Sequence, residues 1–270
     1  MVQCSAIINV MVKAAEKAGR ALARDFGEVE NLQTSKKGPA DFVSIADTKA
    51  EKTLMEELAH ARPNYGFICE ESGVIEGADP HHRWIVDPLD GTTNFLHGIP
   101  IFAISIALQK DRNIIAGVVY NPVTQELFFA ERGQGAFMND RRIRVSSRTQ
   151  MINSLYGTGL PFAGKAGNKR AMYELDAVLR RSSGVRRMGA ASLDLAFVAS
   201  GRLDGYWEWG LNPWDIAAGI ILVRESGGTV DTIIGSGDPV EGQSIIAANE
   251  SSFRSLKKVL KDVKQGKDFE

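Results

Sequence analysis

The segment that most constrains the fold is Pro213–Ser226, a helix that is apolar on nearly all sides until Arg224. Asn212 is placed to cap its first turn, Pro213 suits its first position, and Gly227-Gly228 ends it. A helix without a polar face has no side to expose to water, so it must be buried between other elements. We therefore expect a layered fold with this helix inside it.

Helices and strands alternate along the rest of the chain. Helices are expected from the N-terminus to about Gly27 and over 46–61, 168–181, 190–200 and 250–264, with a polar loop or hairpin over 31–44. Strands are expected over 66–69, 83–86, 184–188 and 205–209, and a three-stranded antiparallel meander over 102–109, 114–120 and 126–131. This order predicts an α/β (α+β) fold in one domain, 1–270, with two lobes, about 1–150 and 151–270, that share an interface.

Charge, cysteine content and hydropathy exclude several classes of partner and location. The 270 residues carry a net charge of −1, so no overall basic field indicates nucleic acid or an acidic membrane as partner. Cys4 and Cys69 lack a metal-type spacing and are expected to be reduced thiols. Charged residues interrupt the apolar N-terminal stretch, and no apolar run reaches the ~18 residues of a membrane span. These features predict a cytoplasmic protein without a membrane partner.

The most informative stretch for function is an apolar strand that runs into Asp87-Pro88-Leu89-Asp90. Pro88 fixes the turn, so the carboxylates of Asp87 and Asp90 can converge on one point. Such a pair repels unless a cation lies between its members. Mg²⁺ prefers oxygen ligands of this kind, and the backbone carbonyl of Leu89 can add another.

The next residues, Gly91-Thr92-Thr93, suit an anion. Gly91 lets the backbone approach a ligand closely, and a short helix that begins here would point its amides at a phosphate. An aspartate-rich turn with no ligand is an equal alternative for this stretch alone.

Two further acidic sites change that balance. Glu70-Glu71 follow an apolar strand, where paired glutamates are uncommon unless one is solvated or both coordinate a ligand. Asp215 lies in the first turn of the apolar helix, where it can cap the helix; if it is buried, it needs a partner or a metal.

Three segments together resemble the motifs of inositol monophosphatases: Glu70–Ser72, Asp87–Phe95 and Trp214–Gly219. Their order and spacing also fit. Gly189–Ala191 and Tyr206–Glu208 fall where that family places substrate contacts. The similarity extends from the first helix to the last, and the joint occurrence of the second and third motifs makes chance agreement very small.

The resemblance implies an αβαβα sandwich, a homodimer, sensitivity to lithium, and hydrolysis of a small phosphate monoester by a water activated by two or three Mg²⁺ ions. Inositol 1-phosphate is the substrate it favours. The implied metal ligands are Glu70, Asp87, the carbonyl of Leu89, Asp90 and Asp215, and the implied catalytic residues are Glu70, Asp90 and Thr92. The implied substrate contacts are Asp90, Gly91, Thr92, Gly189, Ala190, Ala191, Glu208 and Asp215, while Lys36 and Asp47 belong to a mobile loop and the outer edge of the site.

The residues agree with direct attack by water, because no cysteine is positioned as a nucleophile and no Ser-His pair lies at a strand-helix elbow. Two cations about 3.5–4 Å apart would clamp the attacking and leaving oxygens.

Substrate identity stays open. Many inositol-directed members carry Ser or Thr where this chain has Ala190, and Ser192 is a weak replacement. The same fold acts on fructose 1,6-bisphosphate, 3′-phosphoadenosine 5′-phosphate or histidinol phosphate. A regulatory role in binding RNA or protein is an alternative of another class. It would use two groups of arginines: Arg141, Arg142, Arg144 and Arg148, and Arg180, Arg181, Arg186 and Arg187. A solvated surface or dimer salt bridges explain these groups more simply, because the chain as a whole is not basic.

Overall fold

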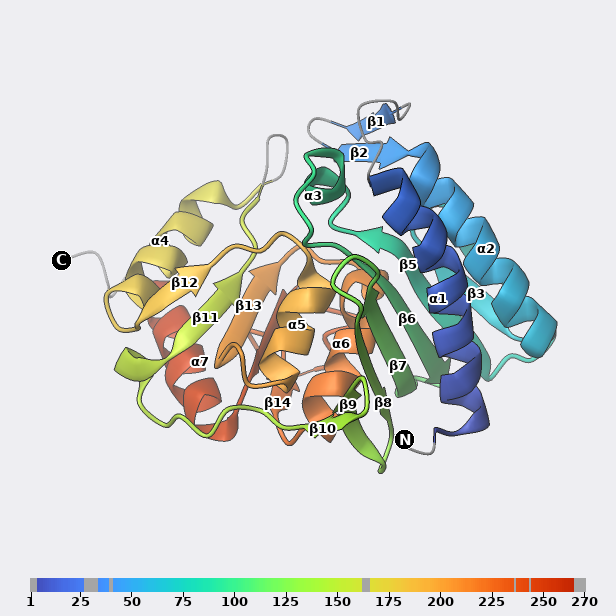
Figure 1. Cartoon of the computed structure of the whole chain (residues 1–270). Coiled ribbons are helices and arrows are strands. Elements are labelled where there is room, and N and C mark those ends of the chain that lie inside the picture. Colours follow the sequence, from blue (N-terminus) through green and yellow to red (C-terminus); the bar gives the residue numbers. More distant parts are fainter. Residues whose placement is uncertain are drawn as a thin grey trace.

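An eight-stranded mixed sheet forms one half of the molecule (Figure 1). In spatial order it contains β10 (Arg141–Ile143), β9 (Gly135–Met138), β8 (Glu126–Glu131), β7 (Asn113–Asn121), β6 (Ala103–Lys110), β5 (His82–Asp90), β3 (Gly66–Cys69) and β4 (Gly73–Ile75). Only β3 and β5 run parallel; the other neighbours are antiparallel, as the expected meander requires. The computed structural model describes residues 4–26, 34–38, 41–161, 166–235, 237–242 and 244–264, with backbone alone for 34–38, 41–44 and 264.

A five-stranded sheet forms the other half. Its order is β12 (Gly184–Arg186), β11 (Leu155–Thr158), β13 (Gly205–Trp209), β15 (Ser244–Ala248) and β14 (Thr229–Asp231). β11 runs parallel to β12 and β13, and β15 runs antiparallel to β13 and β14.

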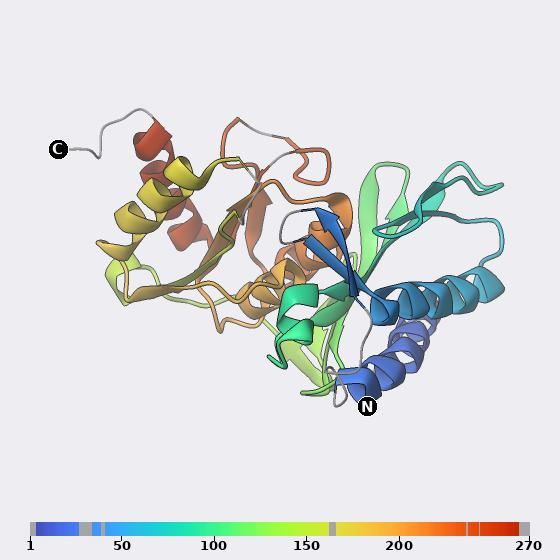
Figure 2. The same ribbon diagram turned by 90° about the horizontal axis from the view of Figure 1, so that it is seen from above.

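Helices complete five layers. The outer face of the large sheet is covered by α1 (Ala6–Phe26) and α2 (Ile45–Ala61), and the outer face of the small sheet by α4 (Asn168–Leu179) and α7 (Glu250–Lys264). Between the sheets lie α5 (Ala191–Ala199) and α6 (Pro213–Glu225). Figure 2 shows the outer helix pairs on opposite sides of the molecule. The expected αβαβα arrangement is confirmed.

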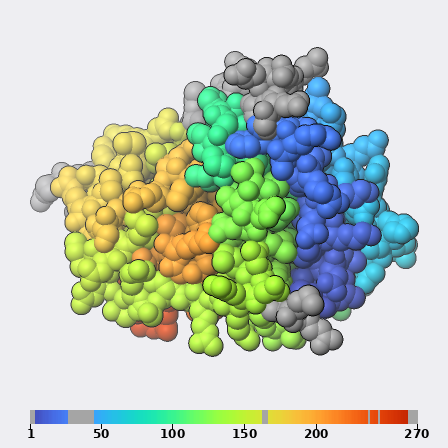
Figure 3. Space-filling model, viewed as in Figure 1, coloured from blue at the N-terminus to red at the C-terminus, as the bar shows by residue number. Residues whose placement is uncertain are grey.

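Three apolar cores separate these layers. One lies between α1, α2 and the large sheet, one between the two sheets, and one between the small sheet and the pair α4 and α7. The middle core contains Ile216–Val223, so α6 is buried as its composition predicts. In the space-filling view, orange residues around α5 fill the surface between the yellow-green and green halves (Figure 3).

A smaller group of elements lies at one end of the layers. The hairpin of β1 (Thr34–Gly38) and β2 (Asp41–Ser44) lies beside the short helix α3 (Thr92–Leu96), and a single 3₁₀ turn, Met151–Asn153, precedes β11. The hairpin is one of the two conformations expected for residues 31–44.

Several predicted boundaries were wrong. The strand expected over 83–86 continues to Asp90, because a bulge, not the end of the strand, accommodates Pro88. The helix expected to reach residue 181 ends at Leu179, and the strand expected to reach 188 ends at Arg186. The short strands β4, β9, β10, β11, β14 and β15 were not predicted. Their three to five residues carry too little periodicity to be recognised without their partners.

Candidate active site

The candidate site begins with a bulge in β5. Asp87 is opposite Ser105 and Asp90 is opposite Ala103, so three steps along β5 match two along β6. Pro88 fits this bulge, because it has no N–H to contribute to the ladder. Asp87 Oδ1 accepts a hydrogen bond from the Leu89 amide at 2.9 Å. Both aspartates are buried, at 1% and 9% exposure.

Asp90 binds the first turn of α5. Its Oδ2 accepts hydrogen bonds from the Ser192 amide at 2.7 Å and from the Ser192 hydroxyl at 2.5 Å. Ala190, the N-cap residue, makes no side-chain cap, so a carboxylate from β5 performs that role. Burial raises the pKa of Asp90 to about 6, although these hydrogen bonds oppose the rise. The Ser192 hydroxyl is therefore engaged with Asp90 and does not replace the missing hydroxyl at position 190.

Glu70 follows β3, the parallel neighbour of β5, and so lies near the end of that strand. Its amide donates to the carbonyl of Val86 at 3.3 Å. The next two residues are anchored to α2: the Glu71 amide and the Ser72 hydroxyl both donate to Glu51, a carboxylate that is 2% exposed. The Glu-Glu-Ser segment is thus held to α2 by its second and third residues.

Asp215 enters from α6. It forms a capping box with Asn212, whose amide donates to Asp215 Oδ2 at 2.7 Å. Ser105, the residue opposite Asp87, donates to the carbonyl of Trp214 at 3.1 Å and so ties the start of α6 to β6. Asp215 is a helix cap, as one interpretation of the sequence proposed, and it also lies within electrostatic reach of the β5 carboxylates.

The acidic residues from these three segments repel one another. The pKa of Asp87 is raised well above its usual value by burial, then by the charges of Glu70, Asp90 and Asp215. The pKa of Asp215 is also raised, by burial and then by Asp90, with Glu70 adding to the effect. Within the described ranges, no three His, Cys, Asp or Glu side chains already enclose a metal-sized position. Several of the carboxylate oxygens instead face backbone or hydroxyl donors.

This donor set fits hard cations. It contains several buried carboxylates whose mutual repulsion a divalent ion would offset, and no thiol or imidazole among them. To bind a shared ion, these side chains would have to move away from their present hydrogen-bond donors.

Thr92 connects the bulge to α2. Its hydroxyl lies 3.0 Å from Asp47 Oδ1 and 3.1 Å from the carbonyl oxygen of Leu89, so its single proton serves one of them at a time. Asp47 is 1% exposed. The side chain of Lys36 lies outside the described residues; its backbone belongs to β1.

Gly91 and Gly189–Ala191 meet, although about 100 residues separate them. Gly91 has φ +95°, and a Cβ added there would lie 2.9 Å from the carbonyl of Ile101 and 3.3 Å from the Cβ of Ala190. The Asn94 amide group reinforces this contact by donating to the carbonyl of Met188 at 2.8 Å. The predicted phosphate-binding and substrate-binding segments are therefore in contact.

Glu208 lies near the end of β13 and accepts a hydrogen bond from the Tyr206 hydroxyl. Its carboxylate occupies the space beside Gly159, where an added Cβ would lie 1.9 Å from it. Burial raises the pKa of Glu208 to about 7, and the charge of Asp90 adds to the rise while Arg187 opposes it. Glu208 is thus within electrostatic reach of Asp90, one of the carboxylates expected to bind metal.

Sequence reasoning missed Asp194. This residue of α5 is 1% exposed, its Oδ1 has no hydrogen-bond partner, and its pKa is raised by burial and then by Glu208 and Asp90. A single acid inside the apolar helix 191–199 was the signal that could have identified it, as Asp215 was identified in α6.

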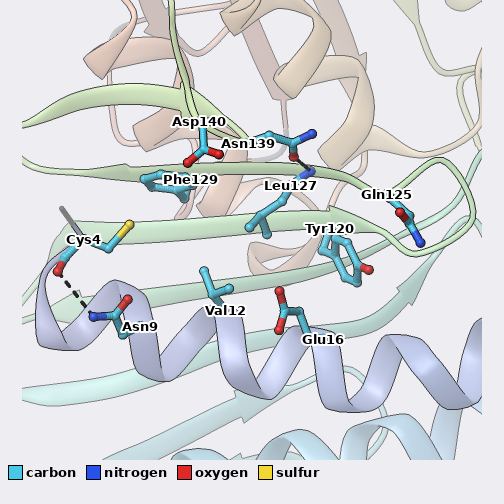
Figure 4. A pocket seen from close by; sticks show the side chains of 10 residues that line it. All are labelled: Cys4, Asn9, Val12, Glu16, Tyr120, Gln125, Leu127, Phe129, Asn139 and Asp140. Atoms are coloured by element: carbon cyan, nitrogen blue, oxygen red, sulfur yellow. Dashed lines mark hydrogen bonds between the residues drawn. The ribbon is translucent and has the colours of Figure 1, made fainter. Parts of the chain in front are cut away.

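A well-defined cavity lies elsewhere. A groove of about 470 Å³ runs between α1 and the sheet, where residues of α1 such as Glu16 face Tyr120 and Phe129 (Figure 4). None of the acidic residues at the end of β5 lines it. The converging carboxylates, and not cavity size, identify the candidate active site.

Comparison with known proteins decides the family. Residues 3–267 match the model of the inositol monophosphatase family. The chain belongs to the inositol monophosphatase family.

An "Inositol-1-monophosphatase" of Mesorhizobium japonicum is 57% identical over 95% of this chain and 97% of its own length. The crystal structure of the extragenic suppressor protein SuhB from Bartonella henselae matches with a TM-score of 0.93 and 56% identity, over 95% of this chain and 99% of that one. A relative from Pseudomonas aeruginosa named "Nus factor SuhB" is 41% identical over 93% of this chain and 94% of its own length.

Family membership indicates a phosphatase that acts on a small phosphate ester. None of the helices described here is long and apolar enough to cross a membrane.

Proposed function

We propose that this protein hydrolyses the phosphate monoester of a neutral polyol, with inositol 1-phosphate as the expected substrate, in a Mg²⁺-dependent reaction. The observation that carries the proposal is the buried group of Asp87, Asp90 and Asp215, three carboxylates from β5 and α6 whose pKa values are raised by burial and by the charges of neighbouring acids. Glu70 acts electrostatically on all three.

The ligands proposed for Mg²⁺ are Glu70, Asp87, the carbonyl of Leu89, Asp90 and Asp215. Bound Mg²⁺ would supply charge neutralisation for the phosphate and the leaving oxygen and would lower the pKa of a bound water. In the overall reaction, the water oxygen bonds to phosphorus, the bond from phosphorus to the alcohol oxygen breaks, and the alcohol leaves with a proton.

Thr92 is proposed to orient the attacking water. Its own proton is donated to Asp47 or to the Leu89 carbonyl, so its oxygen is available as an acceptor. Glu70, from the end of β3, is proposed as the second group on that water. Gly91 and the start of α3 would accept the phosphate at their backbone amides.

The alcohol side of the site favours a neutral polyol. Glu208 and Asp194 are carboxyl groups within electrostatic reach of each other and of Asp90. Two acids against one nearby cation, Arg187, would disfavour a second phosphate there, which argues against fructose 1,6-bisphosphate and 3′-phosphoadenosine 5′-phosphate. Hydroxyl groups, in contrast, can donate hydrogen bonds to carboxylate oxygens. The ammonium group of histidinol phosphate is the competing fit, and the assay below separates the two.

A phosphate-release screen tests the proposal. Inositol 1-phosphate, histidinol phosphate and the two bisphosphorylated compounds are each assayed with Mg²⁺ and with a chelator. Release that is fastest from inositol 1-phosphate and abolished by the chelator supports the proposal. Equal release in chelator contradicts the metal requirement, and faster release from a bisphosphate contradicts the substrate.

Metal binding is tested separately by a crystal soaked in Mn²⁺. Density between Glu70, Asp87 and Asp215 is expected, with metal–oxygen distances near 2.0–2.6 Å for ions of this type. Carboxylate oxygens that stay more than about 8 Å apart around no density would contradict the ligand set. The homodimer and the inhibition by lithium that the family resemblance implies are tested by light scattering and by adding Li⁺ to the assay.

Binding to RNA or to a protein partner is a second candidate function, because a relative is named as a Nus factor. Two of the arginines in question form ion pairs within the chain: Arg148 with Asp204 at 3.3 Å and Arg180 with Asp176 at 2.8 Å. Salt-dependent RNA binding without phosphate release would favour this second function over the first.

A further inference from the structure

β13 presents different chemistry on its two faces. Tyr206 and Glu208 face the candidate site, whereas Trp207 and Trp209 face α4, as the alternation along a strand requires. Glu208 is therefore bracketed by two tryptophans whose side chains lie on the opposite face of the sheet.

Both indoles bind one buried carboxylate, Glu174 of α4. Trp207 Nε1 donates to Glu174 Oε2 at 3.2 Å, and Trp209 Nε1 lies 3.0 and 3.1 Å from the two carboxylate oxygens. Glu174 is 2% exposed, and Arg170 balances its charge with Nε at 3.8 Å. The Arg170 guanidinium also stacks on Trp209, 3.6 Å from the ring centre. Glu174, the two indoles and the Arg170 guanidinium thus contact one another on the face of β13 opposite Glu208.

The end of β13 is restrained on the β11 side by the Thr158 hydroxyl, which donates to the carbonyl of Trp207 at 2.8 Å. Its pairing with β11 ends at Trp207, so Glu208 and Trp209 pair with β15 alone among the strands described. On the β11 side, Glu208 lies against Gly159, which has no side chain to limit its movement. The hydroxyl that holds the Glu208 carboxylate belongs to Tyr206 of the same strand. The position of Glu208 therefore follows that of the end of β13, which the indoles on either side connect to Glu174.

We propose that Glu174 is a positioning residue for substrate selection: through the indoles of Trp207 and Trp209 it fixes the end of β13, and so sets where Glu208 lies on the alcohol side of the site. The inference rests on the proposed phosphatase function and adds a residue on the far face of the sheet to it. Glu174 touches neither substrate nor metal ligands.

The test compares two substrates. Inositol 1-phosphate presents hydroxyls to Glu208, whereas 4-nitrophenyl phosphate does not. In Glu174→Leu, both indole donors lose their acceptor, and KM for inositol 1-phosphate is expected to rise about fivefold, as for one lost hydrogen bond. The kcat for that substrate, and both constants for 4-nitrophenyl phosphate, are expected to stay within about twofold of wild type, since the metal and phosphate groups are untouched.

Two further variants test whether the rise in KM depends on how many of these hydrogen bonds are lost. Glu174→Gln keeps one acceptor oxygen and should give an intermediate KM. Trp209→Phe removes one donor while keeping a ring for Arg170, so it tests the same link if Glu174→Leu does not fold. Asp176→Asn is the matched control: it removes a carboxylate from the same helix, but one that binds only the exposed Arg180. Its constants should match those of wild type.

Glu208→Gln separates the positioning role of Glu174 from the proposed phosphatase function. If it raises KM for inositol 1-phosphate while folded Glu174 and Trp209 variants do not, the positioning role is wrong and the proposed function stands. Parallel losses on both substrates in the Glu174 variants would also overturn the positioning role, because they would indicate general destabilisation. If wild type releases phosphate from no monoester, the proposed function itself fails.

Discussion

Buried carboxylates lie on the outer face of the small sheet and, farther inside, at the candidate site, and the two groups have opposite kinds of neighbours. Glu174, on the outer face, has two indole donors and a guanidinium. Burial raises its pKa to about 7, and these neighbours all oppose the rise. In the inner group, at the candidate site, Asp87 of β5 and Asp215 of α6 lie near other acids, which add to the effect of burial. In the outer group the neighbours offset part of the cost of burying the charge, whereas in the inner group the other acids add to that cost until a cation arrives.

The largest effect is expected for Asp90→Asn. Asp90 connects β5 to α5 and is proposed as a metal ligand, so its loss should lower kcat by about 10³-fold or more with Mg²⁺ present. Circular dichroism should show a folded protein, because Asn can still accept from Ser192. Near-normal phosphate release from a folded variant would show that the inner carboxylates are not a metal site.

The free energy of unfolding, measured without metal, directly tests the difference between the outer and the inner carboxylates. Glu174→Leu should lower the free energy of unfolding by about 2–3 kcal/mol, since it leaves indole donors and Arg170 unpaired in the interior. Asp87→Asn should raise it by about 1–2 kcal/mol, since it removes a charge that other acids repel. Urea denaturation in a chelator measures both. If the two variants change stability in the same direction, the distinction between the outer and the inner carboxylates is wrong.

Glu208→Gln should affect selectivity more than rate. Removing a charged acceptor from the alcohol side costs about 1–3 kcal/mol in binding, so KM for inositol 1-phosphate should rise with a smaller fall in kcat. Glycerol 2-phosphate should be less affected. Unchanged constants for every substrate would place Glu208 outside the site, and an equal loss of kcat on every substrate would make it part of the chemistry.

The last effect concerns pH. Because the pKa of Glu174 is raised from 4.5 to about 7 in the folded protein, the fold binds this proton more tightly than the unfolded chain does. The resulting stabilisation is complete below about pH 4.5 and is lost as the pH rises to about 7. Glu174→Gln should therefore flatten the fall in stability over this range, by up to ~1.4 kcal/mol per pH unit. The same slope in variant and wild type, from urea titrations at several pH values, would argue against the raised pKa.

Much of the architecture follows from local patterns. The apolar helix 213–225 predicted a buried layer, and Asn212 with Pro213 predicted its start, because caps and periodicity act within one turn of helix. The meander was predicted for the same reason. Strands β11, β14 and β15 were missed, since three to five residues form a strand only when distant partners supply the hydrogen bonds.

The sequence by itself determined the family, the layered fold and the set of acidic residues proposed for the metal, because motif residues and their order are local properties of the chain. Only the tertiary structure decided what each acid faces. Asp90 caps α5 through Ser192, Asp194 lies buried without a partner at Oδ1, and Glu174 binds two indoles behind Glu208. These contacts join residues up to about 100 positions apart, and burial and charge at such contacts depend on packing that no local pattern contains.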